Sequence, residues 1–188
     1  AMQFSYQHPE RCERLVLVGA GGLGEEVSTL LRLLALPGVD VVMPVAFQPF
    51  IRTGVETVAG WFDKIGLRPA PHTAEMWHSY TSLMDADART AFNPSLRSVV
   101  DQRGQRVSAM DKLYLAEDIP TLIIWGGEDP IIPIAHAHDA HEVIPGSRLE
   151  IMEGCGHFPY TEQPRAFTRL LTDFIDTTQP AALDAADL

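Results

Sequence analysis

The sequence has few cysteines, few basic residues and no long apolar run, and each shortage excludes a class of protein. Its two cysteines, Cys12 and Cys155, lie far apart and give no disulfide framework, which favours a reducing, cytoplasmic location. Lysine and arginine number 14 against 25 acidic residues, and the net charge of −11 disfavours nucleic acid and anionic membranes as partners. No apolar run reaches the roughly 18 residues that span a bilayer.

The composition is that of a folded, globular chain. With 188 residues and 46% hydrophobic residues, it can form one domain with a substantial core, or a core and a lid. The first residues contain neither the basic region nor the apolar region of a secretory signal, and they suggest a helix entered partway along its length. The sequence shows no internal repeat.

Three apolar segments predict strands of one sheet. Residues 15–18 (L-V-L-V) and 121–125 (T-L-I-I-W) are continuous apolar runs followed by glycine, as expected for parallel strands buried on both faces. Residues 148–152 (R-L-E-I-M) alternate more and predict a third strand. The fold class is therefore α/β with a mostly parallel sheet.

Helical patterns surround these strands. We expect a helical cap over about 23–115, between the first two strands, and a frayed tail over 180–188. Helices are predicted at 1–8, 25–36, 51–64, 72–90, 94–101, 134–143 and 164–177.

Two polar side chains follow the second and third predicted strands. Asp129 lies in a proline-stiffened loop, and His157 lies in a glycine-flanked loop. Because the carboxyl ends of parallel strands meet at one edge of a sheet, a hydrogen bond between these side chains is geometrically natural. A carboxylate that orients an imidazole, which in turn takes a proton from a nucleophile, is the base of a catalytic triad. We therefore predict Asp129 and His157 as catalytic residues, with about 2.6–3.2 Å between a carboxylate oxygen and a ring nitrogen.

The motifs around these residues resemble the C-terminal part of the α/β-hydrolase fold family. Residues 7–19 (Q-H-P-E-R-C-E-R-L-V-L-V-G) resemble the helix, loop and strand that follow its nucleophile elbow. Residues 125–133 (W-G-G-E-D-P-I-I-P) resemble its acid loop, and 154–159 (G-C-G-H-F-P) resemble its histidine loop. Residues 163–167 (Q-P-R-A-F) resemble the start of its closing helix.

The resemblance covers hydrolase-core segments at 1–22 and 116–179 and implies a hydrolase of small, mostly apolar substrates, an ester or related acyl compound. It implies no cofactor and no metal, and a small-molecule substrate as the partner. The family's nucleophile lies in G-x-S-x-G, and no serine here has glycine at both flanking positions. We therefore expect a fragment whose nucleophile, serine or aspartate, lies upstream, so that this chain alone is inactive and its first strand has an unpaired apolar edge.

Two alternatives belong to other classes. Gly19 to Gly24 (G-A-G-G-L-G) match the G-x-G-x-x-G of a dinucleotide-binding enzyme, and Asp40 follows about 20 residues later. Asp40 does not end a clear strand, however, and such a site leaves Asp129 and His157 unexplained. A non-catalytic α/β-hydrolase-like fragment is the other alternative, and it predicts that the upstream chain lacks a nucleophile.

Other candidate site residues have simpler interpretations. His136, His138 and His141 fall on one predicted helix but do not share one face, which favours a polar surface over a metal site. Cys155 lies two residues from His157 and is interpreted as loop packing, not as a nucleophile. Aromatic residues of the expected cap either line a substrate pocket or pack the cap itself: Phe47, Phe50, Trp61, Trp77 and Tyr80.

Overall fold

The computed structural model describes residues 1–39 and 85–183. The helix predicted at 51–64, most of that at 72–90, the five cap aromatics and Asp40 lie outside these described residues. The chain divides into two compact units, one formed by residues 1–28 and 105–188 and the other by residues 29–104. Each unit is described by itself.

The first unit contains a three-stranded parallel sheet in the order β1-β2-β3. Strand β1 is Leu15–Val18, β2 is Thr121–Gly126 and β3 is Arg148–Met152. The three predicted strands are therefore confirmed, with β2 one residue longer than expected. Every residue of β2 is buried, as its central place in the sheet requires.

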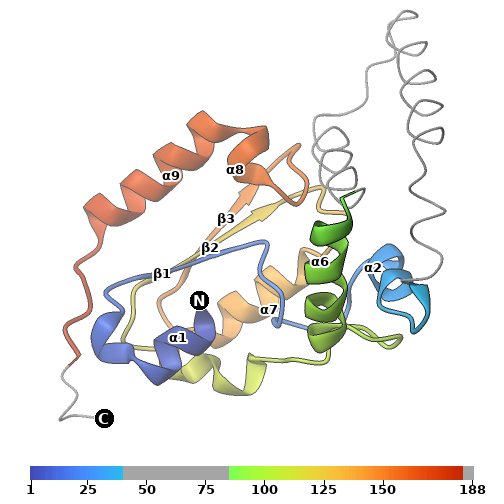
Figure 1. The fold of residues 1–188 in the computed structure, drawn as a ribbon. Coiled ribbons are helices and arrows are strands. Elements are labelled where there is room, and N and C mark those ends of the chain that lie inside the picture. The colour runs from blue at the N-terminus through green and yellow to red at the C-terminus, as the bar shows by residue number, and fades with distance from the viewer. Residues whose placement is uncertain (40–84, 184–188) are drawn as a thin grey trace, which may run out of the picture. The chain divides into compact units, whose positions relative to one another are not determined.

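Helices cover both faces of this sheet (Figure 1). On one face, Leu17, Ile123 and Trp125 pack in a core with η2 (Met110–Ala116) and α7 (Ala135–Val143). On the other face, Leu122 and Ile124 pack against Phe174 of α9 (Pro164–Thr177). Alternate residues along each strand point to opposite faces, so both helical layers are anchored by the same short strands.

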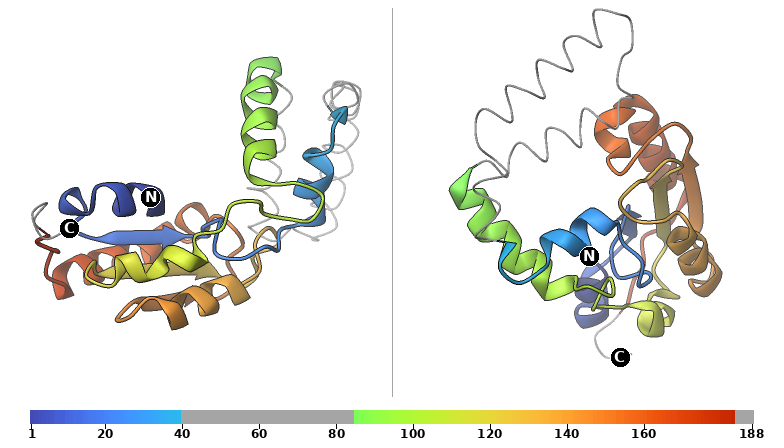
Figure 2. Two further views of the ribbon diagram at one scale, coloured as in Figure 1. Left: turned by 90° about the horizontal axis from the view of Figure 1, so that it is seen from below. Right: turned by 90° about the vertical axis from the view of Figure 1, so that its right-hand side faces the viewer.

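Three short helical segments complete this unit. Helix α1 (Met2–Gln7) is followed by the turn η1 (Pro9–Arg11), and α8 (Pro159–Glu162) precedes α9. Figure 2 shows α1 beside η2, which it contacts. Arg14 ties the chain before β1 to the end of α9, because its Nε and Nη2 donate to the Oγ1 and carbonyl oxygen of Thr178 at 2.9 and 2.7 Å.

The sheet unit extends further into the expected cap and tail than the sequence analysis predicts. Leu23 and Leu113 are fully buried in the core beside α7, so residues at both ends of the expected 23–115 segment belong with the sheet. The Ala181 N–H donates to the Glu13 carbonyl oxygen at 2.9 Å, and Leu183 packs against the same core. Residues 181–183 thus have a backbone bond and apolar contacts to this unit, and residues 184–188 of the expected tail lie outside the described residues.

In the second unit, the structure describes α2 (Thr29–Leu34) and α6 (Ala86–Val99). Helix α2 begins later than the predicted residue 25. Helix α6 begins at an Asp85 cap, whose Oδ1 accepts from the Asp87 and Ala88 N–H groups at 2.9 Å. It continues through Pro94, where we expected a break between two helices. A proline removes one N–H donor but already has a helical φ, and the other bonds of this capped helix maintain it.

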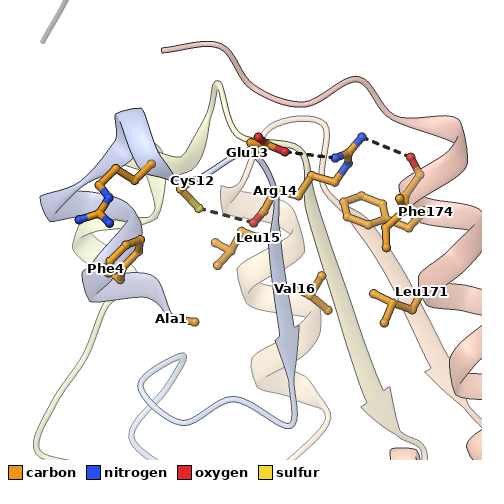
Figure 3. A pocket seen from close by; sticks show the side chains of 11 residues that line it. Ala1, Phe4, Cys12, Glu13, Arg14, Leu15, Val16, Leu171 and Phe174 are labelled. Atoms are coloured by element: carbon orange, nitrogen blue, oxygen red, sulfur yellow. Dashed lines mark hydrogen bonds and ion pairs between the residues drawn. The ribbon is translucent and has the colours of Figure 1, made fainter. Parts of the chain in front are cut away.

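Strand β1 forms one edge of the described sheet, and among residues 1–39 and 85–183 no strand pairs with its outer side. Its Val16 and Val18 remain half-buried. A cavity of about 600 Å³ lies beside the amino end of β1, between α1 and α9, with Phe4, Val16 and Leu171 on its walls (Figure 3). The unpaired edge that we expected at this strand is thus present among the described residues. Over the described residues, every helix is too short or too polar to cross a bilayer.

Candidate active site

The Asp129 carboxylate is fully buried and has three hydrogen-bond donors. It lies in the loop after β2, and its Oδ1 accepts from the backbone N–H groups of Ile131 and Ile132 at 2.8 and 3.1 Å. Its Oδ2 lies 2.8 Å from His157 Nδ1. Two N–H donors at one oxygen fix the plane of the carboxylate and direct the other oxygen at the ring. The predicted distance between the two side chains is therefore confirmed.

The loop that carries Asp129 is itself anchored to the sheet. The buried Trp125 indole Nε1 donates to the carbonyl oxygen of Ile132 at 3.1 Å, which closes the loop over the end of β2. The Glu128 N–H donates to the Cys155 carbonyl oxygen at 2.8 Å and joins this loop to the one that carries His157. The two loops thus form one hydrogen-bonded rim at the carboxyl ends of β2 and β3.

The His157 ring is held on one side and open on the other. Its side chain is 19% exposed, and Nδ1 is the nitrogen that faces Asp129. An ionised carboxylate only accepts hydrogen bonds, so in the neutral ring Nδ1 carries the proton and Nε2 has the lone pair. No described residue bonds to Nε2. The ring also meets the Phe158 ring edge to face, with centroids 5.0 Å apart. This arrangement leaves Nε2 able to remove a proton from another group.

Two residues that the sequence analysis missed contact this site. Gly19, directly after β1, has a φ of +49°, and a Cβ there would lie 3.2 Å from His157 Nδ1. The Glu162 carboxylate accepts from the backbone N–H groups on both sides of His157. Gly19 had a visible signal in the sequence, because it directly follows the predicted strand at 15–18. The second had only a weak signal, a glutamate five residues after the histidine.

The glycine segment at residues 19–24 is hydrogen-bonded to Gln105 of the same chain. Gln105 Oε1 accepts from the Gly22 N–H at 2.7 Å, and the Gln105 N–H donates to the Glu25 carbonyl oxygen at 2.7 Å. In a dinucleotide site the helix begins within the glycine motif, whereas α2 begins only at Thr29. The segment is therefore hydrogen-bonded to other residues of this chain at the place where a dinucleotide-binding enzyme would bind its nucleotide.

The three histidines near α7 face different surroundings. His136 is buried and its ring lies against Gly24, and its Nδ1 has no hydrogen-bond partner in the described part of the chain. His138 is exposed, and His141 Nδ1 lies 2.8 Å from Ser147 Oγ. Among residues 1–39 and 85–183, no group of three possible ligands converges on one point.

Cys155 is fully buried between the histidine loop and the α9 face of the sheet. Burial raises the pKa of its thiol, and the negative charges of Glu162 and Glu128 raise this pKa further. A nucleophilic cysteine needs the opposite, a lowered pKa and access to solvent. Asp129 and His157 therefore remain the candidate site, and the buried thiol of Cys155 packs beside it.

Comparison with known proteins agrees with this fold. The sequence model described as the alpha/beta hydrolase family matches residues 5–170, and the chain belongs to this family. An uncharacterized protein of Mycobacterium tuberculosis is 42% identical over 190 residues, which cover 100% of this chain and 56% of that protein. The 2-hydroxy-6-oxo-6-phenylhexa-2,4-dienoate hydrolase of Burkholderia cepacia is 26% identical over 93% of this chain and 58% of its own.

Among solved structures, a 2-hydroxy-6-oxo-6-phenylhexa-2,4-dienoate hydrolase from Rhodococcus sp. strain RHA1 superposes with a TM-score of 0.61. The identity is 16%, and the match covers 94% of this chain and 59% of that one, so it supports the fold alone. The chain spans a little over half the length of the curated relatives that it matches.

Proposed function

We propose that this chain supplies the acid and the base of a hydrolase that cleaves small, mostly apolar substrates, an ester or a related acyl compound. The observation that carries the proposal is the 2.8 Å contact between Asp129 Oδ2 and His157 Nδ1 at the carboxyl rim of the sheet. Membership of the alpha/beta hydrolase family and the hydrolases among its relatives support the reaction class. No cofactor or metal has a role in the proposed chemistry.

In this mechanism His157 Nε2 removes the proton from a nucleophile as that nucleophile attacks the substrate. Asp129 holds the ring in the Nδ1–H tautomer and stabilises the positive charge that develops on it. The imidazolium then protonates the leaving group. In the second step Nε2 takes a proton from water as that water attacks the acyl carbon. The bond from the acyl group to the nucleophile then breaks, and the imidazolium returns the proton to the nucleophile.

The nucleophile belongs to a segment upstream of this chain, so the chain alone is expected to be inactive. Supporting this, the chain covers 56% of its Mycobacterium relative, and β1 has a free outer edge among the described residues. Serine is the nucleophile that an ester substrate favours. An aspartate nucleophile remains the alternative: it would attack an alkyl carbon of an epoxide or a haloalkane, displace the ring oxygen or the halide, and form an ester that His157 hydrolyses through water.

The experiment uses the protein expressed from the complete reading frame that contains this chain. Its kcat/KM is measured on p-nitrophenyl esters from acetate to octanoate, and on a 2-hydroxy-6-oxo-dienoate of the kind named for the Burkholderia relative. We expect ester hydrolysis in the wild type and a loss of at least about 1,000-fold in His157→Gln, because the triad works as a unit. The matched control is His138→Gln, an exposed histidine on α7.

Equal hydrolysis by wild type and His157→Gln would refute the proposal. Intact-mass spectrometry of His157→Gln after addition of an epoxide or a haloalkane tests for an aspartate nucleophile, and the same measurement with a p-nitrophenyl ester tests for serine. With an aspartate nucleophile His157→Gln accumulates a covalent adduct, whereas with serine the same variant fails before the adduct forms. A thermal-shift titration with NAD and ATP tests the dinucleotide alternative, and we expect no shift.

A further inference from the structure

Glu162 holds the backbone on both sides of His157 with one carboxylate. It is the last residue of α8, five positions after the histidine. Its Oε2 accepts from the Gly156 N–H at 2.8 Å, and its Oε1 accepts from the Phe158 N–H at 3.1 Å. The residues immediately before and after the proposed base are therefore bonded to the same side chain.

Helix α8 also holds the other polar group of Phe158. The N–H groups of Thr161 and Glu162 donate to the Phe158 carbonyl oxygen at 2.9 and 3.0 Å, and Thr161 Oγ1 donates to it at 2.8 Å. This reciprocal bonding resembles a capping box, in which a glutamate in the first turn reaches back to the N–H at the start of the helix. Here the Glu162 carboxylate also accepts from the Gly156 N–H, so its two bonds lie on either side of His157.

The backbone of His157 thus lies between two bonded neighbours, while its ring is bonded to Asp129. A loop that contains glycine has many accessible backbone conformations, and Gly154 uses this freedom with a φ of +70°. The bond to Asp129 fixes the position of Nδ1. The direction in which Nε2 points also depends on the position of the His157 backbone, from which the ring extends. Glu162 supplies that second constraint.

We propose that Glu162 is a positioning residue of the active site, which sets the direction of His157 Nε2 by bonding the two flanking N–H groups. The inference rests on the proposed function, and it adds a residue that does not touch substrate. A carboxylate is needed because both of its oxygens accept, whereas a glutamine offers one oxygen and turns an N–H₂ group toward the second N–H.

The test compares Glu162→Gln and Glu162→Asp with wild type in the same complete protein. Glutamine keeps the length and loses one acceptor; aspartate keeps the charge and loses the reach across both N–H groups. We expect each to lower kcat about 10-fold or more, with KM changed less than about 2-fold, because a misplacement of about 1 Å can cost 100-fold in rate. The matched control is Glu153→Gln, an exposed glutamate four residues before His157, which should keep wild-type kcat.

A readout that does not depend on activity separates this proposal from the proposed function. In protein labelled with ¹⁵N-histidine, the Nδ1 proton shared with Asp129 gives a low-field resonance. We expect Glu162→Gln and Glu162→Asp to shift or broaden it, and Glu153→Gln to leave it in place.

Unchanged kcat and an unchanged resonance in both Glu162 variants would overturn the positioning role, even if their melting temperatures fall. If instead His157→Gln retains full hydrolysis, the proposed function fails, and the resonance alone decides the role of Glu162. Should Glu162→Gln fail to fold, the Glu162→Asp variant decides by the same two measurements.

Discussion

A Cβ atom on Gly126 would lie 1.9 Å from the carbonyl oxygen of Gly156, so the end of β2 and the histidine loop cross in direct backbone contact. The carbonyl oxygen of Cys155 would be 2.5 Å from the same Cβ. Only glycine allows this approach, because backbone atoms cannot turn aside as the end of a side chain can. The crossing brings the histidine loop over the strand that carries Asp129.

Gly126→Ala should therefore lower both stability and activity. Overpacking a well-packed site costs typically about 1–3 kcal/mol, and a clash with backbone belongs at the upper end of that range. Urea unfolding gives the stability, and ester hydrolysis by the complete protein gives the activity. Gly127→Ala is the control, since its Cβ would meet the Glu153 carboxylate at 3.1 Å and that side chain can move. Equal stability of the two variants would contradict the crossing.

Gly19→Ala should reduce activity more than its loss of stability explains. Gly19 has a φ of +49°, where a residue with a Cβ costs roughly 1–2 kcal/mol. Its new methyl would also lie 3.2 Å from the His157 ring, which must shift. Gly38→Ala carries similar backbone strain at a φ of +85°, and no atom of the described residues lies within 4 Å of its new Cβ. We expect both variants to lose similar unfolding free energy and only Gly19→Ala to lose kcat; equal kcat values would be evidence against the contact.

Asp129→Asn should remove most of the activity and little of the fold. The asparagine oxygen can still accept from the Ile131 and Ile132 N–H groups, but its N–H₂ group faces His157 Nδ1. The ring then takes the Nε2–H tautomer and cannot act as a base, which costs about 10⁴-fold in kcat in a serine protease. Asp139→Asn, an exposed aspartate on α7, is the control for kcat. An active Asp129→Asn enzyme would exclude Asp129 from the triad.

Cys155 should make stability fall at alkaline pH. Burial raises the pKa of its thiol in the folded protein, so the folded state favours the neutral form. The stability that the neutral, buried thiol contributes is complete below the ordinary thiol pKa of about 8.5. It is lost as the pH rises toward the raised pKa of the folded state. We expect the stability difference between wild type and Cys155→Ala to shrink from pH 8 to pH 10, as measured by urea unfolding. Parallel pH curves for the two proteins would show that the thiol does not titrate differently on folding.

The sequence was sufficient for the elements whose signal is local. The apolar runs at β1 and β2 and the stripe of α9 were predicted within one residue of their bounds, because burial on two faces or on one helical face leaves a short, regular pattern. The late start of α2 and the continuation of α6 through Pro94 were predicted less well. Both depend on what packs against the segment, and a local pattern does not contain that information.

The sequence alone determined the parallel sheet and the likeness of its loops to a hydrolase, and it predicted Asp129 and His157 as a facing pair. Parallel strands bring their carboxyl ends to one edge whatever the details of packing, which made the pairing predictable. Only the tertiary structure decided that Gly19 lies against the ring and that Glu162 holds both flanking N–H groups. Such contacts depend on backbone paths to within an ångström, and residues far apart in the chain set those paths together.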